Sequence, residues 1–417
     1  MSAKKLGDFI TLQRGTTYKS QLLGQSGAVL IGLASIHREG GFRDDKLETY
    51  GGECPEKISL RAGDLYVSLK DITHDGHLLG AVSRIPEKIK LGRLTQDTVK
   101  LVFLKDEFPT NYIYWLLRTP QCRNYCRSFQ TGTTNLGLAR EDFLSFAVPP
   151  LTDFASSIVG CLEAIEKKIE NLRRQNETLE AIAQTLFKHW FIDFEFPNAD
   201  GKPYKSSGGA MVRSELGDIP EGWHFSIIGD EVETVGGGTP STTEPSYWEN
   251  GDIAWYSPTD LTRAKTLFSI DSEKKITSLG LQKSSAKLFP KYSLLLTSRA
   301  TIGEVTINTK NACTNQGFIT IIPNEKFNVC FLYEWLLTKI EMIKMLASGS
   351  TFPEISKSNF RGLDFLIPVS HILENYEQLI KPIYKKIENN IYQIQTLTKT
   401  RDALLPKLMS GQLRVKE

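Results

Sequence analysis

The sequence predicts an α/β (α+β) chain with an internal pseudo-two-fold repeat: two mixed α/β domains, each followed by a long helix. Two observations predict it. Apolar residues follow a heptad pattern from about residue 154 to residue 192, with no proline inside. The pentapeptide Lys-Lys-Ile-Glu-Asn at 167–171 then recurs at 385–389, inside a second stretch of the same pattern. Two related helices of this kind are expected to pair as an antiparallel coiled coil.

Residues 1–150 form the first predicted domain. Short β-branched and apolar runs at 29–33, 65–69 and 98–104 are typical of strands. Residues 111–118 have the pattern of a short amphipathic helix. A mixed α/β domain with a curved sheet is therefore expected.

The first long helix is predicted over 151–195, with a continuous core of about 35 residues, or roughly 50 Å at 1.5 Å per residue. A helix of that length needs a partner along its apolar seam. A polar residue in the seam, Asn176, either disfavours wrong registers at a cost in stability or remains in contact with water. The seam consists of Ile158, Leu162, Ile165, Ile169, Leu172, Asn176 and Leu179.

Residues 196–222 are rich in glycine, serine and proline and are predicted to be a linker. The second domain, residues 223–370, repeats the order of features of the first. Ile228-Gly229-Asp230 matches Leu6-Gly7-Asp8, and the run at 332–337 matches the run at 112–117. The repeat therefore spans a domain and a long helix, twice.

The second long helix is predicted over 371–417. Its seam contains one asparagine, Asn390, which we expect at a different level of the coiled coil from Asn176. The seam consists of Ile380, Ile383, Ile387, Asn390, Ile394, Leu397 and Leu404.

Composition limits the class of protein. A chain of 417 residues with 40% hydrophobic residues is expected to fold as two to four soluble domains. No apolar run has the length of a membrane span and no signal-peptide core follows Met1, so a cytoplasmic protein is expected. The net charge of +2 favours neither binding nor exclusion of nucleic acid. Six scattered cysteines lack the spacing of a zinc knuckle and are expected to be free thiols.

Catalytic motifs are missing. The sequence has no phosphate-binding Gly-x4-Gly-Lys-Ser/Thr loop, no Gly-x-Ser-x-Gly and no His-Glu-x-x-His. His74 and His77 lie near Asp71 and Asp75, but a polar, glycine-containing loop explains the same residues better than a metal site does. No catalytic residue and no metal ligand is predicted.

Polar loops containing glycine are the candidate binding elements. Their hydroxyls and backbone N–H groups suit phosphates, and arginine, lysine and glutamine side chains suit base edges. Any one of them is also compatible with an ordinary surface turn. The candidate DNA-binding residues are Arg14, Lys70, Gln96, Gln130, Thr133, Thr134 and Asn135 in the first domain, and Thr239, Ser241, Arg299, Asn315, Gln316, Ser350 and Thr351 in the second.

This plan resembles the specificity subunit of a type I restriction-modification system. Beyond the order of domains and helices, the resemblance rests on local sequence typical of such subunits. These motifs are Leu6-Gly7-Asp8, Gly222-Trp223, Gly236-Gly237-Gly238-Thr239-Pro240-Ser241, Trp248-Glu249-Asn250-Gly251-Asp252-Ile253, Trp255-Tyr256-Ser257-Pro258, Thr314-Asn315-Gln316-Gly317 and Leu404-Leu405-Pro406-Lys407-Leu408-Met409-Ser410-Gly411-Gln412-Leu413.

The resemblance implies a non-catalytic DNA-binding subunit. Each globular domain would be a target-recognition domain for one half of a split DNA target, and the conserved long helices would set the gap and dock two modification subunits. Those partners would methylate adenine with S-adenosylmethionine. Restriction subunits would add ATP- and Mg-dependent translocation and cleavage, so no cofactor is expected on this chain.

The first domain's loop, Arg14-Gly15-Thr16-Thr17, lacks the three glycines of its counterpart in the second domain, so an asymmetric target is expected. Three alternatives remain open at this point. They are a stand-alone DNA-binding regulator with a coiled-coil spacer, a metal-dependent nuclease using Asp71, Asp75 and His77, and a purely structural coiled-coil adaptor.

Overall fold

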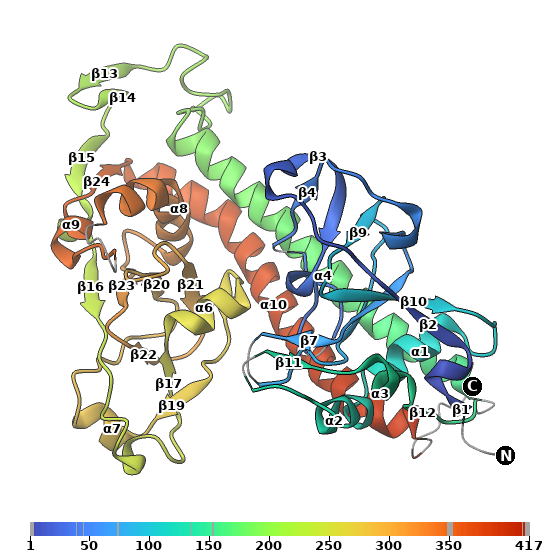
Figure 1. Cartoon of the computed structure of the whole chain (residues 1–417). Coiled ribbons are helices and arrows are strands. Elements are labelled where there is room, and N and C mark those ends of the chain that lie inside the picture. The colour runs from blue at the N-terminus through green and yellow to red at the C-terminus, as the bar shows by residue number, and fades with distance from the viewer. Residues whose placement is uncertain are drawn as a thin grey trace. The chain divides into compact units, whose positions relative to one another are not determined.

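Figure 1 shows a computed structural model of the chain, which describes residues 4–38, 40–44, 46–72, 75–133, 135–151, 154–347, 353–410 and 412. The chain divides into two compact units. Unit 1 comprises residues 1–168 and 397–417, and unit 2 comprises residues 169–396. The long helices α4 (Ala155–Phe191) and α10 (Ser370–Met409) each contribute one part to each unit, which confirms the two predicted long helices.

Unit 1 is built on two four-stranded sheets. The first is antiparallel, in the order β2 (Ile10–Arg14), β10 (Thr98–Phe103), β6 (Leu65–Ser68) and β8 (Val82–Arg84). The second has the order β4 (Thr49–Tyr50), β3 (Leu23–Ile31), β9 (Gly92–Leu94) and β5 (Ser59–Leu60), and β3 and β9 are parallel. The predicted strands and the predicted mixed α/β character are confirmed.

Shorter elements complete unit 1. The predicted helix at 111–118 is α1 (Thr110–Leu117), and its residues from Tyr112 onward are buried. Helix α2 begins at Pro120, where the side chain of Thr119 accepts a hydrogen bond from the Cys122 N–H at 3.3 Å. The remaining elements are β1 (Lys4–Lys5), β7 (Lys70–Asp71), β11 (Leu136–Gly137), β12 (Ala147–Val148), α2 (Pro120–Ser128), α3 (Arg140–Leu144) and the 3-10 turns at Leu6–Asp8, Ser20–Leu22, Leu33–Ser35 and Glu56–Ile58.

Unit 2 repeats this plan. Its larger sheet has the order β16 (Glu233–Gly236), β23 (Phe318–Ile322), β20 (Leu294–Thr297), β21 (Val305–Asn308) and β18 (Phe268–Ser269). Its smaller sheet has the order β19 (Lys274–Ile276), β17 (Ile253–Tyr256) and β22 (Ala312–Thr314), and β17 and β22 are parallel as β3 and β9 are. The other elements are β15 (His224–Ile227), β24 (Asp364–Ile367), α5 (Ile228–Glu231), α6 (Pro258–Ala264), α7 (Ser278–Gln282), α8 (Val329–Leu346), α9 (Lys357–Arg361) and a 3-10 turn at Pro245–Tyr247.

The segment between the two repeats has structure of its own. Phe196 stacks on Tyr204 at 4.5 Å and on Trp223 at 5.2 Å between ring centres. Beyond Tyr204, β13 (Met211–Ser214) and β14 (Gly217–Pro220) form a hairpin. This aromatic stack fixes the connection that composition alone favours as a flexible linker.

The last turns of α4 belong to the core of unit 2. Phe191 contacts Tyr376 of α10 at 4.9 Å and Phe331 of α8 at 5.0 Å between ring centres. Trp190 also contacts Tyr376, at 5.7 Å. The helix is therefore held at this end by aromatic packing, with the apolar seam continuing along it.

The two long helices are antiparallel, as predicted. In unit 2, Phe187 lies against Tyr376 while Asn176 lies against Asn390, so residue numbers fall along one helix as they rise along the other. In unit 1, Glu166 of α4 pairs with Arg401 of α10 at 2.7 Å. Every predicted seam residue is buried or half-buried.

One expectation about the seam is wrong. Asn176 and Asn390 lie at the same level, because the Asn390 Nδ2 atom donates a hydrogen bond to Asn176 Oδ1 at 2.8 Å. Both are buried, with exposed fractions of 7% and 0%. The internal repeat matches the two helices in the same chain direction. In an antiparallel pair, however, matched positions do not face each other, and non-equivalent positions meet. The two asparagines are therefore each other's partner.

Breaking this pair should destabilise unit 2. We expect Asn390→Leu alone to cost about 1–3 kcal/mol, because Asn176 would lose its partner while buried. The double variant Asn176→Leu, Asn390→Leu should restore at least the wild-type stability, because no polar group is left unpaired. Urea unfolding of the four proteins in a double-mutant cycle measures this coupling. Exposed Asn389→Leu is the control, and a double variant less stable than either single one would contradict the paired arrangement.

Candidate nucleic-acid interface

In unit 1, strand pairing brings the candidate loops together. Lys70 of β7 is paired with Gly137 of β11, and this pairing places the loop at 130–135 beside Lys70. Of that loop's candidates, Gln130, Thr133 and Asn135 are exposed, and Thr134 lies outside the described residues.

The other candidates of unit 1 meet where β2 ends and β10 begins. The Arg14 Nε atom donates to the backbone oxygen of Gln96 at 2.9 Å, and Lys70 Nζ donates to Asp97 Oδ1 at 2.7 Å. A Cβ at Gly15 would lie 2.1 Å from the Thr95 oxygen, so only glycine permits this close approach. Arg14, Gln96 and Lys70 thus form one polar, exposed group.

Unit 2 builds the corresponding group from different residues. Thr239 Oγ1 donates to Gln316 Oε1 at 2.6 Å, and a Cβ at Gly237 would lie 1.9 Å from the Asn315 oxygen. Arg299 pairs with Glu354, both as a β-bridge and as an ion pair at 2.7 Å. Ser241 is exposed and shares a hydrogen bond with Thr243. Ser350 and Thr351 lie outside the described residues.

Lys70 and Arg299 occupy equivalent places in the repeat. Strand β10 follows the loop containing Gln96 and pairs with β6, and Lys70 comes shortly after β6. In the same way, β23 follows the loop containing Gln316 and pairs with β20, and Arg299 comes shortly after β20. Each is then bridged to the segment after a glycine-containing loop, at Gly137 or Glu354. Two of the candidate residues therefore occupy the same structural position in the two domains.

Both cations already carry a carboxylate partner. The side chains are half-exposed, 47% for Lys70 and 51% for Arg299. An exposed ion pair is worth about 0–1 kcal/mol, so a phosphate or a guanine edge can replace the carboxylate at little cost. The partners Asp97 and Glu354 were not predicted, because no spacing in the sequence relates them to the two cations.

Asp71 is the last residue of β7 and has a structural role. Asp71 is fully buried, and its Oδ2 accepts a hydrogen bond from the Leu78 N–H at 2.7 Å. Asp75 pairs with Arg38 at 3.1 Å, and His74 lies outside the described residues. Within the described part of the chain, no group of three or more His, Cys, Asp or Glu residues could hold a metal ion.

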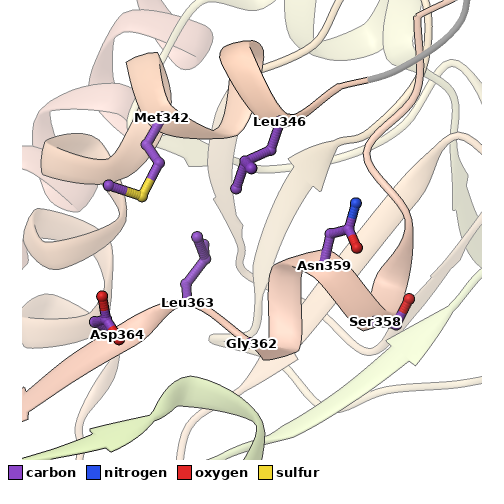
Figure 2. Close-up of a pocket in the computed structure, with 7 residues that line it drawn as sticks. All are labelled: Met342, Leu346, Ser358, Asn359, Gly362, Leu363 and Asp364. Atoms are coloured by element: carbon purple, nitrogen blue, oxygen red, sulfur yellow. The ribbon is translucent and has the colours of Figure 1, made fainter.

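A hollow of about 370 Å³ lies in unit 2, between the end of α8 and the α9 segment. Figure 2 shows the residues that line it. Met342, Leu346 and Leu363 line it with apolar atoms, and polar groups come from its other residues. None of the candidate DNA-binding residues that the structure describes lines this hollow. The described candidate residues lie instead at strand ends and on loops, and most of them are exposed.

Comparison with known proteins assigns the chain to a family. Residues 220–401 match the family model described as the type I restriction modification DNA specificity domain. The MjaIX specificity subunit of Methanocaldococcus jannaschii is 30% identical over 329 residues, which cover 78% of this chain and 73% of that subunit. The chain belongs to the specificity subunits of type I restriction enzymes. As a specificity subunit it is a DNA-recognition component and not a catalytic one.

Two further relatives agree. The HindI specificity subunit of Haemophilus influenzae is 24% identical over 322 residues. The match covers 65% of the chain described here and 69% of the HindI subunit. The solved S subunit of the type I restriction-modification system from M. genitalium has the same fold, with 15% identity, a TM-score of 0.56 and coverage of 98% of this chain and 95% of that one. Among the helices described here, none is long and apolar enough to span a membrane.

Proposed function

We propose that this specificity subunit recognises a bipartite, asymmetric DNA target, with the first domain contacting one half-site and the second domain the other. The observation that carries the proposal is the duplicated loop group, with Lys70 in one domain and Arg299 at the equivalent place in the other. Arginine and lysine differ in base recognition, because arginine donates two parallel hydrogen bonds to a guanine edge. Two groups of different chemistry imply two different half-sites.

The paired helices α4 and α10 then set the distance between the half-sites. A helix of 37 residues, the length of α4, is about 55 Å long at 1.5 Å per residue. That length corresponds to roughly one and a half turns of B-DNA at about 34–36 Å per turn. The same helices offer the docking surface for two modification subunits.

Partner subunits supply the rest of the activity. A net charge of +2 is small for a chain that holds a polyanion, so the modification subunits are expected to share the phosphate contacts. S-adenosylmethionine belongs to those subunits, and ATP and Mg to restriction subunits, in this proposal. The chain acts in the cytoplasm, where the host DNA lies.

The experiment that tests the proposal is co-expression with a modification subunit from the same host, followed by mapping of methylated adenines across the host genome. The expected result is a split motif with a fixed gap. A purified complex that methylates no motif, combined with tight specific binding by the isolated chain, would support a stand-alone regulator instead.

Substitutions at the two equivalent cations should relax different halves of the motif. We expect Arg299→Ala to lose about 1–3 kcal/mol of discrimination at one half-site, which is about 5- to 150-fold, and Lys70→Ala to act on the other. Methylation mapping of each variant measures this. Arg263→Ala and Lys88→Ala remove exposed ion pairs elsewhere in the same units and serve as controls. Relaxation of the same half by both variants would refute independent recognition.

A further inference from the structure

A second hollow in unit 2, of about 360 Å³, has a different composition from the one in Figure 2. It is lined by Thr242, Trp248, Lys274 and Lys275. Thr242 directly follows Ser241, so the hollow adjoins the candidate loop that contains Thr239 and Ser241. The motif Trp248–Ile253 supports the family assignment, but no role in the site has been given to it so far.

The walls of this hollow are held by several contacts. Strand pairing sets Lys274 of β19 opposite Trp255 of β17. The Trp248 ring lies edge-on to the Trp255 ring at 5.1 Å between centres, and its Nε1 atom donates to the Ser241 oxygen at 2.9 Å. The Trp255 Nε1 atom donates to the Gly238 oxygen at 2.9 Å. The hollow and the candidate loop are therefore one connected structure.

The charge in the hollow is positive. Lys274 is exposed, and its Nζ atom lies 5.9 Å from the centre of the Trp248 ring. Lys275 pairs with Asp271 at 3.1 Å, and the same carboxylate also pairs with Lys310 at 3.3 Å. One carboxylate thus serves two lysines, while Lys274 lies over an aromatic ring and has no acidic partner among the residues that the structure describes. This arrangement keeps an ammonium group available at the surface.

We propose that this hollow binds a phosphodiester of the DNA backbone beside the half-site of the second domain. Lys274 contacts the phosphate, the Thr242 hydroxyl lies within the same hollow, and the Trp248 ring packs against the adjoining deoxyribose. A lysine ammonium is a compact point charge suited to phosphate and lacks the planar double donor that recognises guanine. The inference rests on the proposed function and adds a positioning contact that does not depend on base sequence.

In the first domain, a glutamate takes the place of Lys274. There, Val29 pairs with Thr49 and with Gly92, as Ala254 pairs with Lys275 and with Ala312. Continuing this register by one residue sets Glu48 opposite Leu30, as Lys274 is opposite Trp255, and the backbone oxygen of Glu48 accepts from the Leu30 N–H at 2.9 Å. Glu48 therefore takes the place of Lys274. A carboxylate at that place repels phosphate, so the backbone contact belongs to the second domain alone.

The test is the salt dependence of DNA binding by the purified complex with its modification subunit, using a duplex that carries the methylated motif and a scrambled duplex. We expect Lys274→Ala to reduce the slope of log K against log salt by about 0.9. When the salt concentration rises from 50 to 200 mM, the fold-loss of affinity should therefore be about 3.5 times smaller for the variant than for wild type. Both duplexes should be affected alike, and Lys274→Arg should restore the slope.

Lys291→Ala is the matched control, because Lys291 is also an exposed lysine over an aromatic ring, 5.4 Å from the centre of Tyr292, but lines no part of the hollow. An unchanged slope for Lys274→Ala would overturn the proposal. So would a loss confined to the methylated motif, since that marks a base contact. If the wild-type complex bound both duplexes equally, the proposed function itself would fail, and this outcome is distinct from the first two.

Discussion

Aspartate at both Ile169 and Ile387 is expected to remove most of the stability of unit 2. Both isoleucines are fully buried in that unit, one on each long helix. A buried carboxylate with no partner costs several kcal/mol, and two of them together approach the whole stability of a typical domain, about 5–15 kcal/mol. The midpoint of thermal unfolding, followed by circular dichroism, should therefore fall sharply. Methylation by the complex should be lost with it.

The repeat itself provides a matched control. Asn171 and Asn389 are the exposed asparagines that end the two copies of the repeated pentapeptide. The variant Asn171→Asp, Asn389→Asp makes the same change in net charge on the same helices. It should shift the unfolding midpoint by only a small amount. Equal effects of the two double variants would show that helix charge, rather than burial in the seam, determines the stability.

The long helices could be predicted closely because their signal is local and long. A heptad pattern repeated over tens of residues specifies each helix, and the structure contains both long helices, as α4 and α10. The duplication added a second, independent signal for the domains. Strands β6 and β10 were found because each is a short apolar or β-branched run.

The partners of individual polar residues could not be predicted in the same way. The pairing of Asn176 with Asn390 depends on how two helices align. The ion pairs of Lys70 with Asp97 and Arg299 with Glu354 depend on how segments outside the large sheets meet. These contacts join residues with no fixed spacing in the sequence. Geometry in three dimensions decides them, and one sequence does not contain that information explicitly.

The segment at 196–222 shows a signal that could have been used. Glycine, serine and proline make up 11 of its 27 residues, which favours a linker. Yet Phe196, Tyr204 and Trp223 fall within or beside it, and they form the aromatic stack that fixes it. Large aromatic residues are rare in flexible linkers because their burial is strongly favourable.

The other large effect expected concerns pH. Glu334 of α8 is buried, with 2% of its surface exposed, and accepts a hydrogen bond from the Tyr384 hydroxyl at 2.6 Å. Burial raises the pKa of Glu334 to about 7, the Tyr384 hydrogen bond opposes this shift, and the charge of Glu180 adds to it. In the unfolded chain the same carboxyl has its ordinary pKa of 4.5. Above pH 4.5 the unfolded state therefore releases this proton more readily than the folded state.

The sign of the stability change follows from this difference. The contribution of Glu334 is fully present below about pH 4.5 and is lost as the pH rises towards 7, in total about 3 kcal/mol. Glu334→Gln keeps an acceptor for Tyr384 but carries no ionisable proton. It should flatten the decline in stability between pH 5 and pH 8, and make unit 2 more stable than wild type at pH 8. Urea denaturation, monitored by hydrogen exchange of the α8 amides, measures both the pH dependence and the stability at pH 8.

Glu341→Gln separates burial from a general loss of charge on α8. Glu341 lies on the same helix, is exposed, and pairs with Lys344 at 2.8 Å. Its substitution should leave the pH profile of unit 2 unchanged. Burial also raises the pKa of Glu180 to about 7, ahead of the charge of Glu177, so Glu180→Gln should remove a further part of the decline. If Glu334→Gln instead lowered stability equally at pH 5 and pH 8, Glu334 would have to be ionised in the folded chain and stabilised by a partner. Its place against Tyr384 would then need a different explanation.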